Sequence, residues 1–165
     1  IPSLADAGPM VTGQRIKEIL AMGADGVTVP HVENLDQGRQ VVSLFADARA
    51  DVWSAVNPNG SVIAMMMLED PDAMAAAPQI ADIGGYSVLA CGIGSLTGAL
   101  KGDRKAAEAG NQALLAETKR VKLVNMLTAS AGDVVQRVKE GFLGLLAMGN
   151  DTDAVIRAGR AAAGR

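Results

Sequence analysis

The chain has 165 residues, of which 49% are apolar, 20% charged and 2% aromatic, and its formal net charge is −3. This length allows one domain with a real core, whereas a complete eight-unit β/α barrel usually needs about 250 residues. The few aromatic and scattered basic side chains argue against nucleic acid and anionic membranes as partners. No apolar run in the sequence is long enough to span a bilayer.

Five short runs of mostly apolar residues predict β-strands. They are continuous rather than alternating, which is typical of parallel strands covered on both faces. The runs span residues 26–29, 62–68, 86–91, 121–126 and 142–147. The single cysteine, Cys91, lies in the third run and cannot form a disulfide within the chain. A single cysteine within an apolar run is expected to be a core residue. The absence of an internal disulfide fits a reducing compartment, so we expect a cytoplasmic protein.

The segments between these runs predict helices. Ile16, Ile19 and Leu20 lie three and four residues apart and form one apolar stripe, with Gly23 as a plausible stop. Asn34 and Asp70-Pro71 are suited to helix starts. Further helices are expected over residues 96–100, 103–119, 134–140 and 152–163.

Strands and helices that alternate in this order predict right-handed crossovers and a parallel sheet. This pattern alone leaves two α/β architectures, an open doubly wound sheet and a closed barrel. Gly92 and Gly94 form a Gly-x-Gly, but the third glycine of a dinucleotide loop is missing. No boundary for a second domain is visible, so residues 1–165 are expected to form one domain.

Glu69 directly follows the run at 62–68, so it is expected at the carboxyl end of a strand. Barrel enzymes carry their active sites at that end. A carboxylate there can bind a divalent cation or act as a base. Glu69 and Asp70 can equally cap the next helix and complement its dipole, and the sequence alone favours neither interpretation.

Other polar residues also follow predicted strands. Ser95 could contact substrate or a metal-bound water, although its position favours a cap for the short helix at 96–100. His31, the only histidine, could act as an acid or base, although a single loop histidine is more often structural. Weaker candidates, each also suited to capping, are Glu33, Asn34, Asn125, Thr128 and Asp151.

Several of these segments together resemble the HpcH/HpaI aldolase family. Residues 16–34 look like its fourth strand region, and residues 65–70, ending in Glu69-Asp70, look like its fifth strand. Residues 88–96 are similar to its sixth strand, and residues 141–151 to its eighth. The motifs cover nearly the whole chain and keep their order.

The resemblance implies a (β/α)8 TIM barrel, of which this chain would be a part covering about the last five strands. It also implies a homo-oligomer, a hexamer or trimer of dimers, with the last helix exchanged between subunits. The expected reaction makes or breaks a carbon–carbon bond beside a 2-oxo acid such as pyruvate, with an aldehyde as the second partner. A divalent cation, Mg²⁺, Mn²⁺ or Co²⁺, would stabilise the enolate.

Carried over residue by residue, the resemblance makes Glu69 a metal ligand. Gly92 and Gly94 match the loop whose backbone contacts the substrate carboxylate, with Ser95 beside them. Leu127 matches an apolar residue of the substrate pocket. The resemblance assigns no catalytic residue within this chain, and His31 is a catalytic candidate only from its position after a predicted strand.

Departures from the family pattern weaken the expected cation site. The second metal carboxylate, an Asp in the family, is Ser95 here, and a hydroxyl is a much weaker ligand for a hard cation. Met67 and Ile93 replace a Gln and a Pro, and Ala21 replaces an Asp that some members supply from a neighbouring subunit. The family's first strands, with a catalytic His and an Arg, would precede Ile1.

Three functions remain open from the sequence. The first is a metal-dependent 2-oxo-acid aldolase that uses Glu69. The second is a catalytically impaired or non-catalytic barrel that serves as an oligomeric binding subunit. The third is a related lyase or hydrolase with a rearranged site, in which Ser95 and His31 take part.

Overall fold

Six short strands form one fully parallel sheet. The structure is a computed structural model and describes residues 4–8 and 11–165. The strands lie in the order in which they occur in the chain, from β1 at one edge to β6 at the other. They are β1 (Leu4–Asp6), β2 (Gly26–Val29), β3 (Ile63–Leu68), β4 (Val88–Cys91), β5 (Val124–Ala129) and β6 (Gly144–Ala147).

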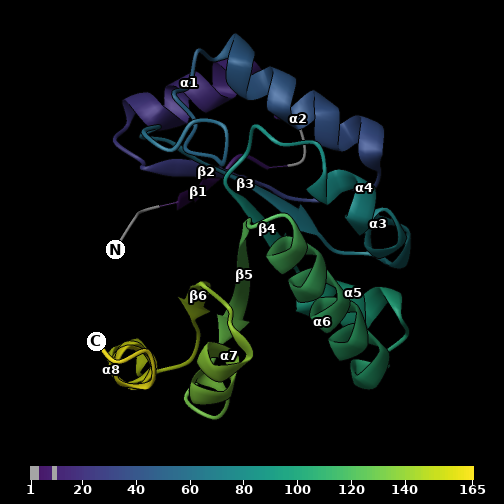
Figure 1. The fold of residues 1–165 in the computed structure, drawn as a ribbon, viewed down its shortest axis with the longest axis vertical. Coiled ribbons are helices and arrows are strands. Elements are labelled where there is room, and N and C mark those ends of the chain that lie inside the picture. The colour runs from purple at the N-terminus through teal and green to yellow at the C-terminus, as the bar shows by residue number, and fades with distance from the viewer. Residues whose placement is uncertain (1–3, 9–10) are drawn as a thin grey trace.

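Eight helices alternate with these strands in the described part of the chain. Their bounds are α1 (Gly13–Ala21), α2 (Leu35–Asp47), α3 (Pro71–Ala75), α4 (Ala77–Ala81), α5 (Ile93–Ala99), α6 (Arg104–Arg120), α7 (Val134–Glu140) and α8 (Thr152–Ala162). Figure 1 shows an open arc in which the strands lie on the inner side and most helices on the outer side.

The consecutive strand order decides between the two predicted architectures. A doubly wound sheet reverses its strand order at a switch point and carries helices on both faces. Here every strand pairs with the next one in the chain, and every pair is parallel. The chain therefore forms an incomplete β/α barrel of six strands, one strand more than the sequence predicted.

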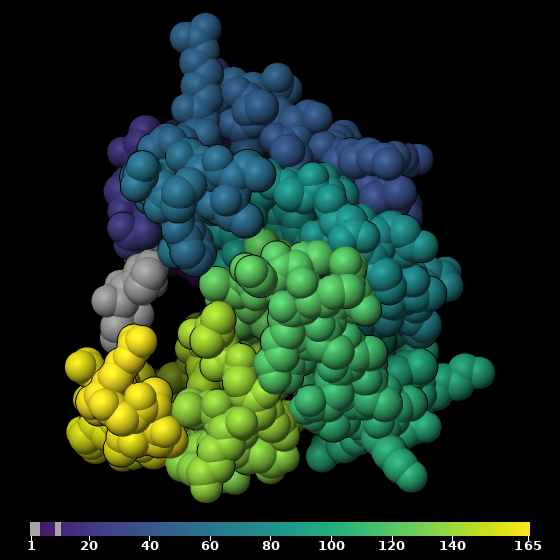
Figure 2. All heavy atoms as spheres, in the orientation of Figure 1, coloured from purple at the N-terminus to yellow at the C-terminus, as the bar shows by residue number. Residues whose placement is uncertain are grey.

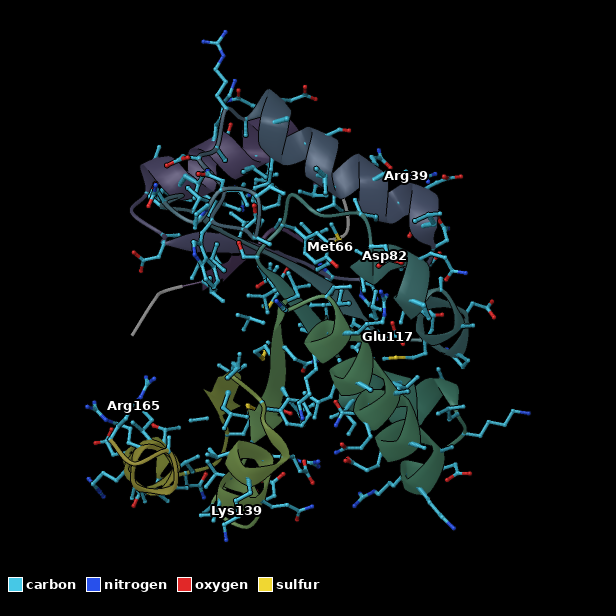
Figure 3. All side chains as sticks on the ribbon, in the orientation of Figure 1. Arg39, Met66, Asp82, Glu117, Lys139 and Arg165 are labelled. Carbon is cyan, nitrogen blue, oxygen red and sulfur yellow. The ribbon has the colours of Figure 1, made fainter. Side chains whose placement is uncertain are left out.

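The two faces of the sheet bury different side chains. The outer face packs Met66, Leu89 and Leu127 against the helices in the main hydrophobic core. Met66 lies between the sheet and α2 (Figure 3). A smaller cluster of Met65, Val88, Ala90 and Met126 occupies the other face, the inside of the arc. Because side chains alternate along a strand, Glu69 and Gly92 continue this inner face at the strand ends.

Side-chain caps begin most helices where the sequence predicts them. Asn34, Asp70, Asp103 and Asp151 each accept a hydrogen bond from the backbone N–H three residues further on. Gly141 ends α7 with φ 98°, a left-handed conformation that glycine adopts without strain. These residues mark where four helices begin and where α7 ends.

Two strand predictions need correction. β1 is too short, at three residues, to stand out as an apolar run. β5 begins at Val124, three residues after the predicted start. Val121 is instead the C-cap of α6, and Lys122 turns the chain with φ 58°. Asn125 therefore lies at the amino end of β5 and not at its carboxyl end.

The C-terminal helix α8 lies at the margin of the arc. Figure 2 shows it in yellow as a lobe beside α7. Its Val155 packs against Val134 of α7 in a small separate cluster. Within the described residues, no helix is both long and apolar enough to cross a membrane.

Candidate functional site

The carboxyl ends of three neighbouring strands bring Glu69, His31 and Gly92 together. Glu69 directly follows β3 and Gly92 directly follows β4, while His31 comes two residues after β2. β2, β3 and β4 are adjacent and parallel, so their carboxyl ends form one rim. This group of residues is called the β2–β4 rim below.

One oxygen of Glu69 binds His31 twice. The backbone N–H of His31 donates to Oε2 at 3.0 Å, and the imidazole Nδ1 lies 2.9 Å from the same oxygen. The Glu69 side chain is 10% exposed, whereas the His31 side chain is 58% exposed. The buried carboxylate thus orients an imidazole whose other nitrogen, Nε2, is left for contacts at the rim.

His31 adopts a conformation that few non-glycine residues take. Its φ is 54°, in the left-handed region, where histidine is more common than most side chains but still rare. Such backbone strain persists only where surrounding contacts hold it and is concentrated at functional sites. Here the two contacts with Glu69 hold it.

Gly92 is required by the close approach of Glu69. A Cβ on Gly92 would lie 2.5 Å from both Cγ and Oε1 of Glu69. Any side chain at position 92 would therefore push the carboxylate away from its place beside His31. Gly94, two residues further on, has open space around its Cα.

Ser95 does not cap a helix as predicted. α5 begins at Ile93 with Gly92 as its N-cap, so Ser95 lies exposed in the first turn. The structure also does not bring Leu127 to the rim. Leu127 is 1% exposed and packs in the helix-covered core, because its strand presents Met126 and Thr128 to the other face.

The donor set at the rim does not fit the two-carboxylate cation site that the family resemblance implies. Glu69 is the one carboxylate there, and its Oε2 already accepts a hydrogen bond from the backbone N–H of His31 and lies 2.9 Å from the imidazole Nδ1. Asp70 caps α3, and Ser95 offers only a hydroxyl. No group of three or more His, Cys, Asp or Glu side chains that could hold a metal occurs among the described residues.

Two of the weaker candidates are structural, and so is Cys91. Asn34 and Asp151 cap helices, as the alternative interpretation predicts. Cys91 is buried, and burial together with the nearby Glu108 and Glu69 carboxylates raises the pKa of its thiol to about 12. Cys91 is therefore a protonated core residue, as the sequence indicates.

The sequence analysis missed a charged cluster between α6 and α7, which we call the Arg137 cluster. Arg137 is 11% exposed; it binds both oxygens of Glu108 at 2.6 and 2.9 Å and also contacts Glu140 and Asp133. Burial would raise the pKa of Glu108, but hydrogen bonds from Arg137 and Gln112 outweigh it and lower that pKa. Glu108 and Arg137 lie on different helices, and the charge pattern of each helix does not indicate that the two helices pack together.

Solved structures with the same fold include members of the family that the sequence resembles. An HpcH/HpaI aldolase/citrate lyase family protein from Burkholderia cenocepacia J2315 has a TM-score of 0.73 at 18% identity, over 98% of this chain and 72% of its own. The HpcH/HpaI aldolase from Desulfitobacterium hafniense DCB-2 has a TM-score of 0.73 at 16% identity, with 99% and 72% covered. No family model and no curated protein matches the sequence.

A third similar structure was solved with ligands. It is the citrate lyase beta subunit from M. tuberculosis, complexed with oxaloacetate and magnesium, with a TM-score of 0.65 at 16% identity, over 95% of this chain and 71% of its own. At these identities the comparisons establish the fold. The resemblance seen in the sequence is thus matched by structures of HpcH/HpaI aldolase and citrate lyase proteins.

Proposed function

We propose that this chain carries the active rim of a carbon–carbon lyase that acts on a 2-oxo acid. The observation that carries the proposal is the Glu69–His31 contact at the carboxyl ends of β2 and β3, beside Gly92 and the first turn of α5. Proteins of the same fold include aldolases and an oxaloacetate-bound citrate lyase subunit, which supports a 2-oxo acid as the substrate class.

The chemistry of aldol cleavage suits an oriented imidazole. The bond between the carbinol carbon and the carbon next to the 2-oxo group breaks, the hydroxyl loses its proton, and an aldehyde and an enolate form. A base must take the hydroxyl proton, and the enolate carbon must then gain one. Glu69 holds Nδ1 of His31, so Nε2 can accept and return that proton while the backbone of Gly92 and Gly94 meets the substrate carboxylate.

A divalent cation would supply Lewis-acid stabilisation of the enolate oxygen. Glu69 is the residue proposed to hold it, with Ser95 in place of a second carboxylate. These donors fit such a cation poorly. The proton transfers proposed for His31 therefore do not depend on a bound cation. We also propose that the protein works as a homo-oligomer in the cytoplasm, following the family resemblance.

The test is an aldol-cleavage assay on the full-length protein. A 4-hydroxy-2-oxo acid is incubated with it, and the released pyruvate is followed by NMR with and without Mg²⁺. We expect release of pyruvate that falls by about 100-fold in Glu69→Gln and His31→Ala, the usual size of an acid–base contribution. Glu33→Gln, which changes an exposed carboxylate of the same loop, is the matched control. Equal rates in all variants would reject the assignment.

The second candidate is a barrel that binds without catalysing, as an oligomeric binding subunit. The observation that favours it is Ser95, since the missing carboxylate would disable a metal-dependent site. In that case pyruvate binds at the rim and shifts the NMR signals of His31, the only histidine, yet no product forms. Sedimentation of the full-length protein then determines whether it assembles.

A further inference from the structure

A cavity of about 280 Å³ lies at the opposite end of the barrel from the β2–β4 rim. It opens where α6 ends, β5 begins and the chain passes from α7 to β6. Figure 1 shows α6 returning to the start of β5 at this end. Its lining residues are Leu115, Thr118, Lys119, Lys122, Leu123, Asn125, Gly141 and Leu143.

Asn125 in the wall of this cavity has an unpaired amide. The residue is 2% exposed, and neither Nδ2 nor Oδ1 has a hydrogen-bond partner. Leaving both a donor and an acceptor unpaired in the interior is costly, and native proteins rarely do so. Thr118 cannot pair with the amide as a donor, because its hydroxyl donates to the carbonyl of Leu115 at 2.9 Å.

The rest of the lining combines positive charge with apolar surface. Lys119 and Lys122 both line the cavity, and no acidic side chain does in the described part of the chain. The ammonium of Lys119 donates to the carbonyl of Glu140, which holds it over Gly141. Leu143, which is 75% exposed, and the exposed Lys122 line the cavity from the surface of the molecule.

We propose that this cavity binds a small organic acid that carries a second polar oxygen, such as a short hydroxy acid. The carboxylate meets the two lysines, the second oxygen pairs with the amide of Asn125, and the carbon atoms lie against the leucines. The site is separate from the β2–β4 rim and does not depend on the lyase proposal. A ligand here bridges α6, β5 and the segment before β6.

The test uses lactate as the probe, with NMR of the full-length protein as the readout. Propionate lacks the hydroxyl and lactamide lacks the charge, so each removes one half of the proposed recognition. We expect lactate to shift the side-chain amide signals of Asn125 and to bind about tenfold more tightly than either analogue. Shifts of the His31 ring signals instead would mean binding at the rim only and would overturn the proposal.

Variants separate recognition from simple packing. Asn125→Leu, which keeps the branched shape but removes the polar atoms, should abolish lactate binding, and Lys122→Gln should weaken it about tenfold. Lys105→Gln removes an exposed charge elsewhere on α6 and should leave binding unchanged. If Asn125→Leu fails to fold, the comparison of the three probes on the unmutated protein still decides. Equal binding of lactate, propionate and lactamide, or none by lactate, would refute the site.

Discussion

Glu69 and His31 show how two chemically ordinary residues come together as a candidate site. They are 38 residues apart in the sequence and meet because two parallel strands end side by side. The strand ends could be predicted from apolar runs, and so both residues were candidates. Their contact could not be, since it depends on a left-handed φ at His31 that no sequence pattern indicates.

Gly92→Ala tests whether this glycine holds the carboxylate in place. A Cβ would lie 2.5 Å from Glu69, so we expect the carboxylate to shift and the contact with His31 to be lost. The ring signals of His31 should change in the NMR spectrum, and the free energy of unfolding should fall by about 1–3 kcal/mol. Gly94→Ala, which meets open space, is the control for the His31 signals. Unchanged signals in Gly92→Ala would contradict the geometry.

Ser95→Asp tests the departure from the family pattern. If position 95 faces the cation as the resemblance implies, a carboxylate there adds the charge that a hard cation needs, so Mn²⁺ affinity should rise by about tenfold, or about 1.4 kcal/mol. Isothermal titration of the variant and of the unmutated protein with Mn²⁺ measures the change. An unaltered affinity would show that position 95 does not face the cation and that the carry-over from the resemblance is wrong there.

At the scale of elements, the sequence predicts helices better than strand boundaries. Polar caps such as Asn34 and Asp103 mark helix starts directly. The sequence places the start of β5 three residues too early, because Val121 and Leu123 continue the apolar run. Both residues lie in the turn after α6 and pack against the helix-covered core. That shift also moved Asn125 from the predicted rim to the opposite end of the sheet.

The Arg137 cluster joins α6 to α7 and makes stability depend on pH. The pKa values of Glu108, Asp133 and Glu140 are all lowered, because hydrogen bonds from Arg137 and other donors outweigh burial. Carboxylates with lowered pKa values stabilise the fold above their unfolded pKa. This contribution is lost as the pH falls through the folded pKa, so we expect stability to decline from about pH 5 downwards.

Arg137→Met should reduce that dependence. At pH 7 we expect a loss of about 2 kcal/mol, discounted because the carboxylate partners are partly exposed. The decline between about pH 5 and pH 3 should also become shallower than in the unmutated protein. Urea unfolding across this pH range measures both effects. Arg39→Met, which removes an exposed ion pair with Asp36, should change neither. Parallel pH profiles for Arg137→Met and the unmutated protein would contradict the cluster's role.

At the scale of the whole molecule, the two proposed sites lie at opposite ends of the parallel sheet. The carboxyl ends of β2, β3 and β4 carry the proposed lyase rim, and the amino end of β5 carries the proposed acid-binding cavity. The alternation of strands and helices predicted a parallel sheet, and the resemblance predicted a barrel. The consecutive strand order confirms the parallel sheet and a barrel-like arc of six strands.

The central claim is that Glu69 orients the imidazole of His31, and the tautomer of His31 tests it directly. Its ring signals are easily assigned, because His31 is the only histidine in the chain. A long-range ¹⁵N–¹H correlation spectrum, recorded where the ring is neutral, reports which nitrogen carries the proton. We predict the proton on Nδ1, facing Glu69, in the unmutated protein, and on Nε2 in Glu69→Ala. A proton on Nε2 in both proteins would contradict the contact on which the proposed chemistry depends.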